Sequence, residues 1–273
     1  MADTTQIEWT DRTFNPWTGC TKISPGCDNC YAEGWSKRSG HVKWGNNPRK
    51  RTTDAYWKAP LAWERDAKAF EARFGRRQRV FCASLADVFD NQVDPSWRAD
   101  LFDLIRLTPS LDWQLLTKRP QNIKKMLPDS WGALGWPNVW LGFTAEDQKR
   151  YDERAAVMGK VPASVWFVSY EPAIGPLRLN GKGPFPNWLI IGGESGPGAR
   201  AMEPQWVSDV LDDCRRGGIA PFFKQWGQYE NNPLTGQLQL PKADMKGIDP
   251  HGKGGGLVGG QIVREFPVCG HAA

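Results

Sequence analysis

Short runs of apolar residues recur along the chain, each long enough for a β-strand but too short for a typical helix. They cover 80–83, 113–116, 139–143, 165–169, 188–191 and, more weakly, 221–223. These runs are continuously apolar rather than alternating, which is typical of strands covered on both faces, as in parallel sheets. Between them, amphipathic segments with helical spacing begin at Asp94-Pro95 and at Glu203-Pro204. This alternation predicts βα units and a parallel sheet, closed or partly closed into a barrel.

The length of 273 residues suits one large domain. We expect a single α/β domain, residues 1–273, containing a partial (β/α)6-type parallel barrel over residues 13–227. An insertion at 35–79 is basic and Trp-rich, and a Gly-rich C-terminal tail at 228–273 is predicted to be a long loop or flexible lid. No apolar run reaches the length of a membrane span, and the N-terminus lacks a signal-peptide pattern. We therefore expect a cytoplasmic protein without a membrane partner, whose cysteines are reduced or bind metal.

Polar side chains follow each apolar run, at the point where each strand should end. In parallel barrels the carboxyl ends of the strands carry the functional site, so we expect these side chains to surround one cavity. Any one of them could instead serve only the backbone of its loop. The set comprises Ser84 and Asp87; Thr117, Lys118 and Arg119; Thr144 and Glu146; Tyr170 and Glu171; Glu194 and Ser195; and Lys224 and Gln225.

The net charge of +5 is concentrated in the insertion. Residues 35–79 contain thirteen Lys or Arg and four Asp or Glu, a local balance of +9 that leaves −4 for the rest of the chain. Cations neutralise phosphates and flat rings stack on unpaired bases, so this mixture predicts contact with nucleic acid. The alternative is a solvated surface whose tryptophans anchor an irregular insertion. The aromatic residues concerned are Trp35, Trp44, Tyr56, Trp57, Trp63, Phe70 and Phe74.

Three of the six cysteines, Cys20, Cys27 and Cys30, lie within eleven residues and have the spacing C-x6-C-x2-C. A C-x2-C pair directs two thiolates at one centre from a single tight turn, and Pro25-Gly26 supplies turn residues that bring in the third. Thiolates grouped in this way bind a soft metal. The spacing leaves two alternatives open: a zinc ion with His41 as fourth ligand, and a [4Fe–4S] cluster with one open iron.

The block from Asn15-Pro16-Trp17 to Cys30-Tyr31-Ala32 resembles the cluster motif of radical S-adenosylmethionine (SAM) enzymes, and within them the spore photoproduct lyase-like branch. It is more similar still to a phage-associated group of three-Cys-motif proteins in that superfamily. Further similarity follows at 82–87, 115–120 and 142–144, so the resemblance covers residues 13–200. The family usually has C-x3-C where this chain has C-x6-C, and we expect Pro25-Gly26 to fold the additional residues out as a bulge.

The resemblance implies that Cys20, Cys27 and Cys30 ligate three irons of a [4Fe–4S] cluster and that SAM chelates the fourth. One electron would then cleave SAM into methionine and a 5′-deoxyadenosyl radical, which abstracts a hydrogen atom from the substrate. The electron would come from a donor such as flavodoxin or ferredoxin.

The same resemblance assigns contacts with SAM. By position, Ser84 and Asp87 would meet its ammonium, Lys118 its carboxylate and Thr144 its ribose. Cys82, just before these residues, becomes a candidate hydrogen-atom donor on a strand expected to point at the cavity. The alternative for Cys82 is a buried small hydrophobe.

The leading hypothesis is a radical SAM enzyme that acts on nucleic acid or a nucleotide, in repair or base modification. Its alternatives are a non-catalytic, zinc-stabilised nucleic-acid-binding protein and a radical SAM enzyme for a small metabolite or peptide. Three polar residues, Glu171, Glu194 and Lys224, are candidates for the substrate without assigned roles. Of the other cysteines, Cys214 lies on a helical apolar stripe and is expected in the core, and Cys269 lies in the tail without a prediction.

Overall fold

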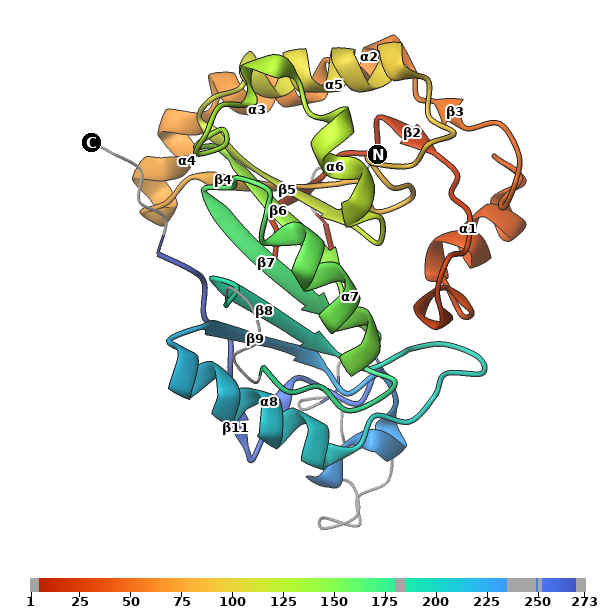
Figure 1. The fold of residues 1–273 in the computed structure, drawn as a ribbon, viewed down its shortest axis with the longest axis vertical. Coiled ribbons are helices and arrows are strands. Elements are labelled where there is room, and N and C mark those ends of the chain that lie inside the picture. The colour runs from red at the N-terminus through yellow and green to blue at the C-terminus, as the bar shows by residue number, and fades with distance from the viewer. Residues whose placement is uncertain (1–4, 180–184, 235–248, 250–251, 269–273) are drawn as a thin grey trace.

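Seven parallel strands form a curled sheet, a half-barrel, at the centre of the protein (Figure 1). The computed structural model describes residues 5–179, 185–234, 249 and 252–268. The strands cross the sheet in chain order, and all six apolar runs lie in it. The prediction of an α/β fold with a parallel sheet is therefore confirmed, with the two-residue β1 as an additional strand. The strands are β1 (Arg12–Thr13), β4 (Gln78–Cys82), β5 (Leu111–Thr117), β6 (Val139–Thr144), β7 (Val165–Tyr170), β8 (Trp188–Gly192) and β9 (Ala220–Gln225).

Helices cover one face of this sheet. Strand residues such as Val80, Leu141 and Ile191 share an apolar cluster with Leu101 of α5 and Val207 of α8. Figure 1 shows α6, α7 and α8 in front of the strands. The described part of the link between β7 and β8 contains no helix, so the βα alternation is interrupted there. The helices are α5 (Pro95–Arg106), α6 (Pro120–Met126), α7 (Gln148–Met158) and α8 (Pro204–Gly217), with a short 3-10 turn η2 (Asp129–Trp131) after α6.

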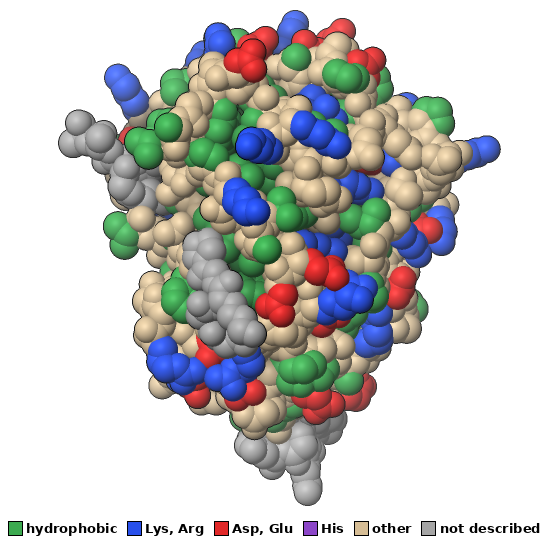
Figure 2. Space-filling model, viewed as in Figure 1, with side chains coloured by type: hydrophobic (Ala, Val, Ile, Leu, Met, Phe, Trp, Pro, Cys, Tyr) green, Lys and Arg blue, Asp and Glu red, His purple; other side chains and the backbone are tan. Residues whose placement is uncertain are grey.

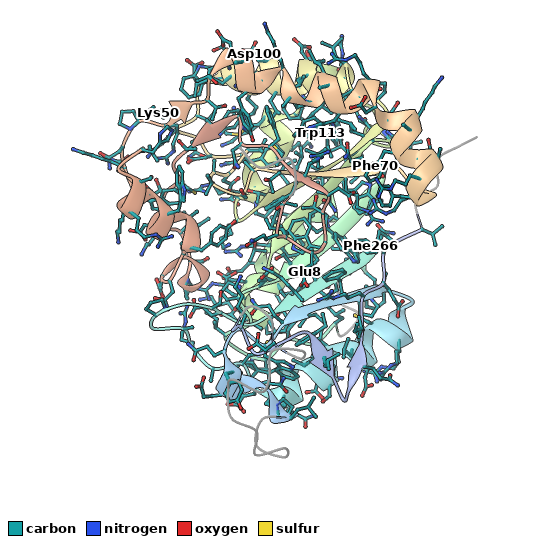
Figure 3. All side chains as sticks on the ribbon, turned by 180° about the vertical axis from the view of Figure 1, so that it is seen from behind. Glu8, Lys50, Phe70, Asp100, Trp113 and Phe266 are labelled. Atoms are coloured by element: carbon teal, nitrogen blue, oxygen red, sulfur yellow. The ribbon has the colours of Figure 1, made fainter. Side chains whose placement is uncertain are left out.

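The other, concave face of the sheet carries a second apolar cluster, built mainly from aromatic rings. Alternate strand residues point to it because side chains on a strand have a period of two. The two ends of the chain close it, since Trp9 and Phe266 lie against Trp188 with ring centroids 6.0 and 5.4 Å away. Figure 3 shows the molecule from this side, with Phe266 labelled. Both faces are thus apolar, which explains the uninterrupted runs. The strand residues of this cluster are Phe81, Trp140, Val165, Phe167, Trp188, Ile190 and Phe222.

The insertion is largely helical and is anchored by its aromatic residues. Tyr56, Trp57 and Trp63 surround Phe14, with ring centroids 5.1, 5.7 and 6.5 Å from it. These three rings pack against the interior, as expected if the aromatic residues anchor the insertion to the rest of the fold. Its elements are β3 (Lys50–Arg51), α2 (Asp54–Trp57), α3 (Ala59–Arg65) and α4 (Ala67–Phe74), preceded by α1 (Tyr31–Ser39), and β3 pairs with β2 (Trp17–Thr18).

The described part of the C-terminal tail lies along β9. Backbone hydrogen bonds join Phe223 to Val263 and Glu265 to Pro221, at 2.7 and 2.8 Å. The tail contains the turn η3 (Tyr229–Asn231) and a hairpin of β10 (Leu257–Val258) and β11 (Gln261–Ile262). The predicted lid falls mostly on residues 235–248 and 250–251, outside the described residues, as does Cys269. None of the described helices combines the length and apolar character needed to cross a membrane.

Candidate functional site

Residues 20–30, here named the cysteine segment, lie across the carboxyl ends of the strands. The amide of Gly19, just before it, donates to Leu85 O after β4 (3.0 Å). Further on, the Gly26 amide donates to Glu146 after β6 (3.3 Å), and Asn29 Nδ2 donates to Glu194 after β8 (2.9 Å). Figure 1 shows α1, which follows the segment, on the side toward which the strands point. The polar strand ends and the three cysteines therefore meet at one edge of the sheet.

The three cysteines occupy different local structures on this segment. Cys20 is half-buried, and Arg119 Nη1 donates to its Sγ at 3.4 Å. Burial and the nearby Asp87 carboxylate raise the pKa of Cys20 to about 11, against the opposing effect of Arg119. Cys27 is buried in the 3-10 turn η1 (Pro25–Cys27), which takes up the additional residues of the first gap, and Cys30 is the N-cap of α1. Without a metal Cys20 is thus a thiol, and metal binding would release its proton.

Within the described residues, no three His, Cys, Asp or Glu side chains form a group that could hold a single metal ion. The possible fourth zinc ligand, His41, is exposed and lies against Trp35, with ring centroids 5.7 Å apart. The donors that the segment itself offers are three soft thiols.

Asp87 is buried at the centre of a hydrogen-bond network. Its Oδ1 accepts from Thr117 Oγ1 (2.7 Å) and the Phe89 amide (2.9 Å). Its Oδ2 accepts from the Lys118 amide (3.2 Å) and Arg119 Nη1 (2.9 Å). A carboxylate offers about four acceptor positions, and four donors occupy them here. Asp87 thus orders the loop after β5 and directs Arg119 at Cys20, and protein donors engage both of the oxygens for which we predicted a ligand ammonium; that contact stays a prediction.

The other predicted SAM contacts lie at the same edge. Lys118 is half-buried, and its Nζ donates to Thr144 Oγ1 at 3.4 Å. Thr144 ends β6 on the concave side, since it alternates with Trp140. Ser84 Oγ accepts from Asn15 Nδ2 (3.0 Å), and Ser84 O accepts from the Tyr31 hydroxyl (2.7 Å). The structure therefore brings Ser84, Lys118 and Thr144 to one rim.

Cys82 lies on the opposite face from the one expected. It is fully buried in the helix-side cluster together with Val80, whereas Phe81 between them belongs to the concave cluster. Burial raises the pKa of its thiol. Cys82 is therefore a small core residue here rather than a group that points into the cavity. Cys214 is also buried in the core, as predicted.

Three ion pairs lie at the carboxyl ends of the strands, and two of them contact the cysteine segment. Glu146 pairs with Arg154 and Glu194 with Arg200, both at 2.6 Å, and Glu171 pairs with Lys224. Burial alone would raise the pKa of Glu146 and Glu194, but their arginine partners outweigh it and lower both pKa values. Both carboxylates are therefore ionised.

Sequence reasoning missed the two arginines of these pairs, Arg154 and Arg200, and also Asn29. One signal was present in the chain. Each glutamate comes within two residues of the end of a strand, and its arginine follows it by no more than eight residues.

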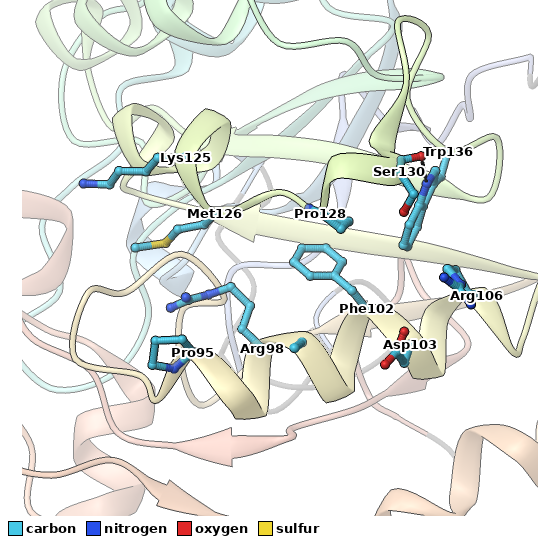
Figure 4. Close-up of a pocket in the computed structure, with 11 residues that line it drawn as sticks. Pro95, Arg98, Phe102, Asp103, Arg106, Lys125, Met126, Pro128, Ser130 and Trp136 are labelled. Carbon is cyan, nitrogen blue, oxygen red and sulfur yellow. Dashed lines mark hydrogen bonds between the residues drawn. The ribbon is translucent and has the colours of Figure 1, made fainter.

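A groove of about 460 Å3 lies away from this edge, between α5 and the segment from α6 to η2 (Figure 4). Phe102, Met126 and Trp136 form its apolar wall, and Arg106 and Lys125 lie at its rim. It contains none of the predicted site residues.

The cations of the insertion fall into two structural classes. Arg49 is buried and pairs with Asp90 at 2.6 Å, and the Arg51 guanidinium lies 3.9 Å from the centroid of the Trp57 ring. By contrast, four cations on α1 and on the segment that leads to β3 are exposed. Figure 2, in the same view as Figure 1, shows Lys and Arg side chains at the right, where α1 lies. The exposed cations from α1 to the first residue of β3 are Lys37, Arg38, Lys43 and Lys50, and Lys58, Arg65, Lys68 and Arg73 further along the insertion are exposed as well.

A family model described as a protein of unknown function, DUF5131, matches residues 4–267 of the chain. No curated protein and no solved structure matches it.

Proposed function

Because the chain belongs to the DUF5131 family, whose function is unknown, its activity must be inferred from its site, and we propose a radical SAM enzyme that acts on nucleic acid or a nucleotide. The observation that carries this proposal is the course of the cysteine segment. Its three thiols lie across the carboxyl ends of a parallel half-barrel, beside a rim with a cationic side chain, Lys118, and a hydroxyl, Thr144. In such folds this edge is where substrates and cofactors bind.

The donor set fits a [4Fe–4S] cluster held by Cys20, Cys27 and Cys30. Thiolates are the usual ligands of such clusters, and each binds a different iron, so the sulfur atoms need not converge on one ion. A structural zinc ion, by contrast, needs four ligands at one centre, and His41 lies against Trp35 instead. When bound, the cluster and SAM together supply a carbon-centred radical that abstracts a hydrogen atom.

The rim residues of this chain would bind and orient SAM. Lys118 donates to its carboxylate, Thr144 hydrogen-bonds its ribose, and the Ser84 hydroxyl accepts from its ammonium. Asp87 acts as a positioning residue, because it holds Arg119 and the Lys118 amide in place. The concave face of the sheet below them is built mainly from buried aromatic side chains.

The substrate class is inferred from the exposed cations next to the cysteine segment. Lys37, Arg38, Lys43 and Lys50 suit contacts with phosphates. The reaction also requires an external one-electron donor, such as flavodoxin or ferredoxin.

Anaerobic reconstitution with iron and sulfide tests this function. We expect a brown protein with about four irons per chain, whose paramagnetic resonance spectrum after reduction changes when SAM is added. Reduction with dithionite in the presence of SAM should yield 5′-deoxyadenosine. Cys27→Ala should lose most of the iron, whereas Cys214→Ala, which removes a buried core thiol, should keep it. A colourless protein that contains one zinc ion per chain would overturn the proposal.

A further inference from the structure

We propose that Glu146 and Glu194 are positioning residues that fix the shape of the cysteine segment from its two sides. Each is an ionised carboxylate just after a strand end and is paired with an arginine that follows it in the chain, Arg154 of α7 for Glu146 and Arg200 of the loop after β8 for Glu194. The part of this inference that concerns the cluster rests on the proposed function, whereas the anchoring of the segment does not.

Glu146 holds the segment from beneath. It has no exposed surface, and its Oε1 accepts from the Gly26 amide while its Oε2 accepts from Arg154 Nη1. The same Arg154 nitrogen donates to Thr144 O at 2.6 Å, so the pair is tied to the end of β6. A Cβ atom at Gly26 would lie only 3.0 Å from Glu146 Oε1. Glycine at this position therefore permits the close approach of backbone and carboxylate.

Glu194 holds the segment at the end of β8, two strands along the sheet from β6. Its Oε2 accepts from Asn29 Nδ2, and Arg200 binds both of its oxygens. The Arg200 guanidinium then reaches the segment itself, because Nη2 donates to Pro25 O (2.8 Å) and Nη1 to Asp28 Oδ2 (3.2 Å). One buried carboxylate thus fixes three residues around Cys27.

These contacts give a role to the long first gap between the cysteines. The carbonyl of Thr21 accepts from Arg119 Nη2 at 2.8 Å, so the gap begins at the end of β5. It ends at Pro25 and Gly26, which bind the loops after β8 and β6. The gap residues therefore span the rim, and the contacts of Thr21, Pro25 and Gly26 that anchor them are made by backbone atoms rather than by the thiols.

Hydrogen exchange of the metal-free protein tests the anchoring by itself. Glu146→Gln and Glu194→Gln keep the side-chain volume but remove the charge that holds each arginine. We expect amides of residues 20–30 to exchange about tenfold faster or more in either variant. Asp213→Asn is the matched control, because Asp213 is an equally buried carboxylate paired with Arg178 outside the segment. Unchanged exchange of the segment in both glutamine variants would overturn the proposal.

Redox titration of the reconstituted protein tests the effect on the cluster. Glu194→Gln removes one of the two carboxylates that pair with Arg200 and so makes the surroundings of the segment more positive, which should raise the midpoint potential above that of the wild type. Adding Arg200→Met removes the Arg200 charge and should return the potential toward the wild-type value, while the faster exchange persists. A midpoint potential that does not change in Glu194→Gln would overturn the proposed effect of the Glu194–Arg200 pair on the cluster. Faster exchange in a protein that assembles no cluster would uphold the anchoring and reject the proposed function.

Discussion

Gly142, on β6, shows how one missing side chain shapes the concave face. A Cβ atom at this position would lie 2.4 Å from Cζ of Phe167, whose ring crosses the glycine from β7. The ring cannot move away freely, because Phe167 is buried in the concave cluster. Glycine is therefore required by packing rather than by backbone conformation.

Gly142→Ala should accordingly lower the free energy of unfolding by about 1–3 kcal/mol, the usual effect of overpacking a core. The control is Gly34→Ala within α1, where the nearest atom to a new Cβ is the flexible Arg38 Nη1 at 3.4 Å. That change should stabilise the protein by up to about 1 kcal/mol, because alanine favours the helix. Urea denaturation of both variants measures the difference. If Gly142→Ala unfolds at the wild-type urea concentration, the packing argument is wrong.

Lys118 is the residue at which SAM binding can be tested most directly. Lys118→Met keeps the length of the side chain but removes the charge, so the dissociation constant for SAM should rise about tenfold or more. Lys124→Met, an exposed lysine of the neighbouring α6, should leave it unchanged. Isothermal titration of the reconstituted proteins under anaerobic conditions makes the comparison. Equal affinities in the two variants would remove Lys118 from the proposed site.

At the scale of elements, α8 is tied to the link after β7 by one carboxylate. Asp213 accepts two hydrogen bonds from Arg178, both at 2.9 Å, and one from the Leu179 amide at 2.7 Å. Burial alone would raise the pKa of Asp213, but these hydrogen bonds and the Arg178 charge outweigh it and lower the pKa. The link has no described helix of its own, so this contact replaces the packing that a crossover helix would provide.

Asp213→Asn should therefore destabilise the protein in a pH-dependent way. Because the folded-state pKa lies below the unfolded value, the ionised group stabilises the fold above the unfolded pKa, near 4, and the contribution disappears as the pH falls through the folded pKa. At pH 7 we expect a loss of about 1.5–3 kcal/mol, and the loss should shrink progressively as the pH falls below the unfolded pKa and through the folded one. Thermal unfolding across this pH range measures both. A difference between variant and wild type that is constant with pH would contradict the assignment.

Much of the element order could be predicted because its signals are local. Asp94 caps α5 by accepting from the Ser96 amide, Pro95 is its first residue, and α8 ends at Gly217 before the left-handed Gly218. By contrast, β1 has only two residues and no apolar run, so pairing with β4 alone defines it.

At the scale of the whole molecule, the distribution of cations decides how nucleic acid binding can be tested. Arg49 and Arg51 are parts of the fold, so neutralising them would destabilise the insertion rather than report on binding. The exposed cations beside the cysteine segment are the informative ones.

Changing Lys37, Arg38, Lys43 and Lys50 together to Gln should weaken binding of a single-stranded oligonucleotide about tenfold or more. The dependence of the binding constant on salt should also become shallower, by about one unit for each phosphate that the variant no longer neutralises. The control changes four exposed lysines on other elements, Lys124, Lys125, Lys149 and Lys160, and should have little effect. Fluorescence anisotropy at several salt concentrations gives both values. Equal weakening in the two quadruple variants would leave only unspecific attraction and contradict the proposed surface.

The sequence by itself determined the class of fold, the positions of the six apolar strands, the grouping of the three cysteines and the polar residues at the strand ends. These properties depend on composition and on near neighbours in the chain, so apolar runs, capping residues and spacing are sufficient to predict them. The tertiary structure alone decided that Cys82 faces the helices, that Asp87 accepts from four protein donors and that Glu146 and Glu194 hold the cysteine segment. The reason is physical: a strand that is apolar on both faces does not reveal which face is which. In addition, a charged side chain is free or occupied according to partners that are distant in sequence and that only folding brings into contact.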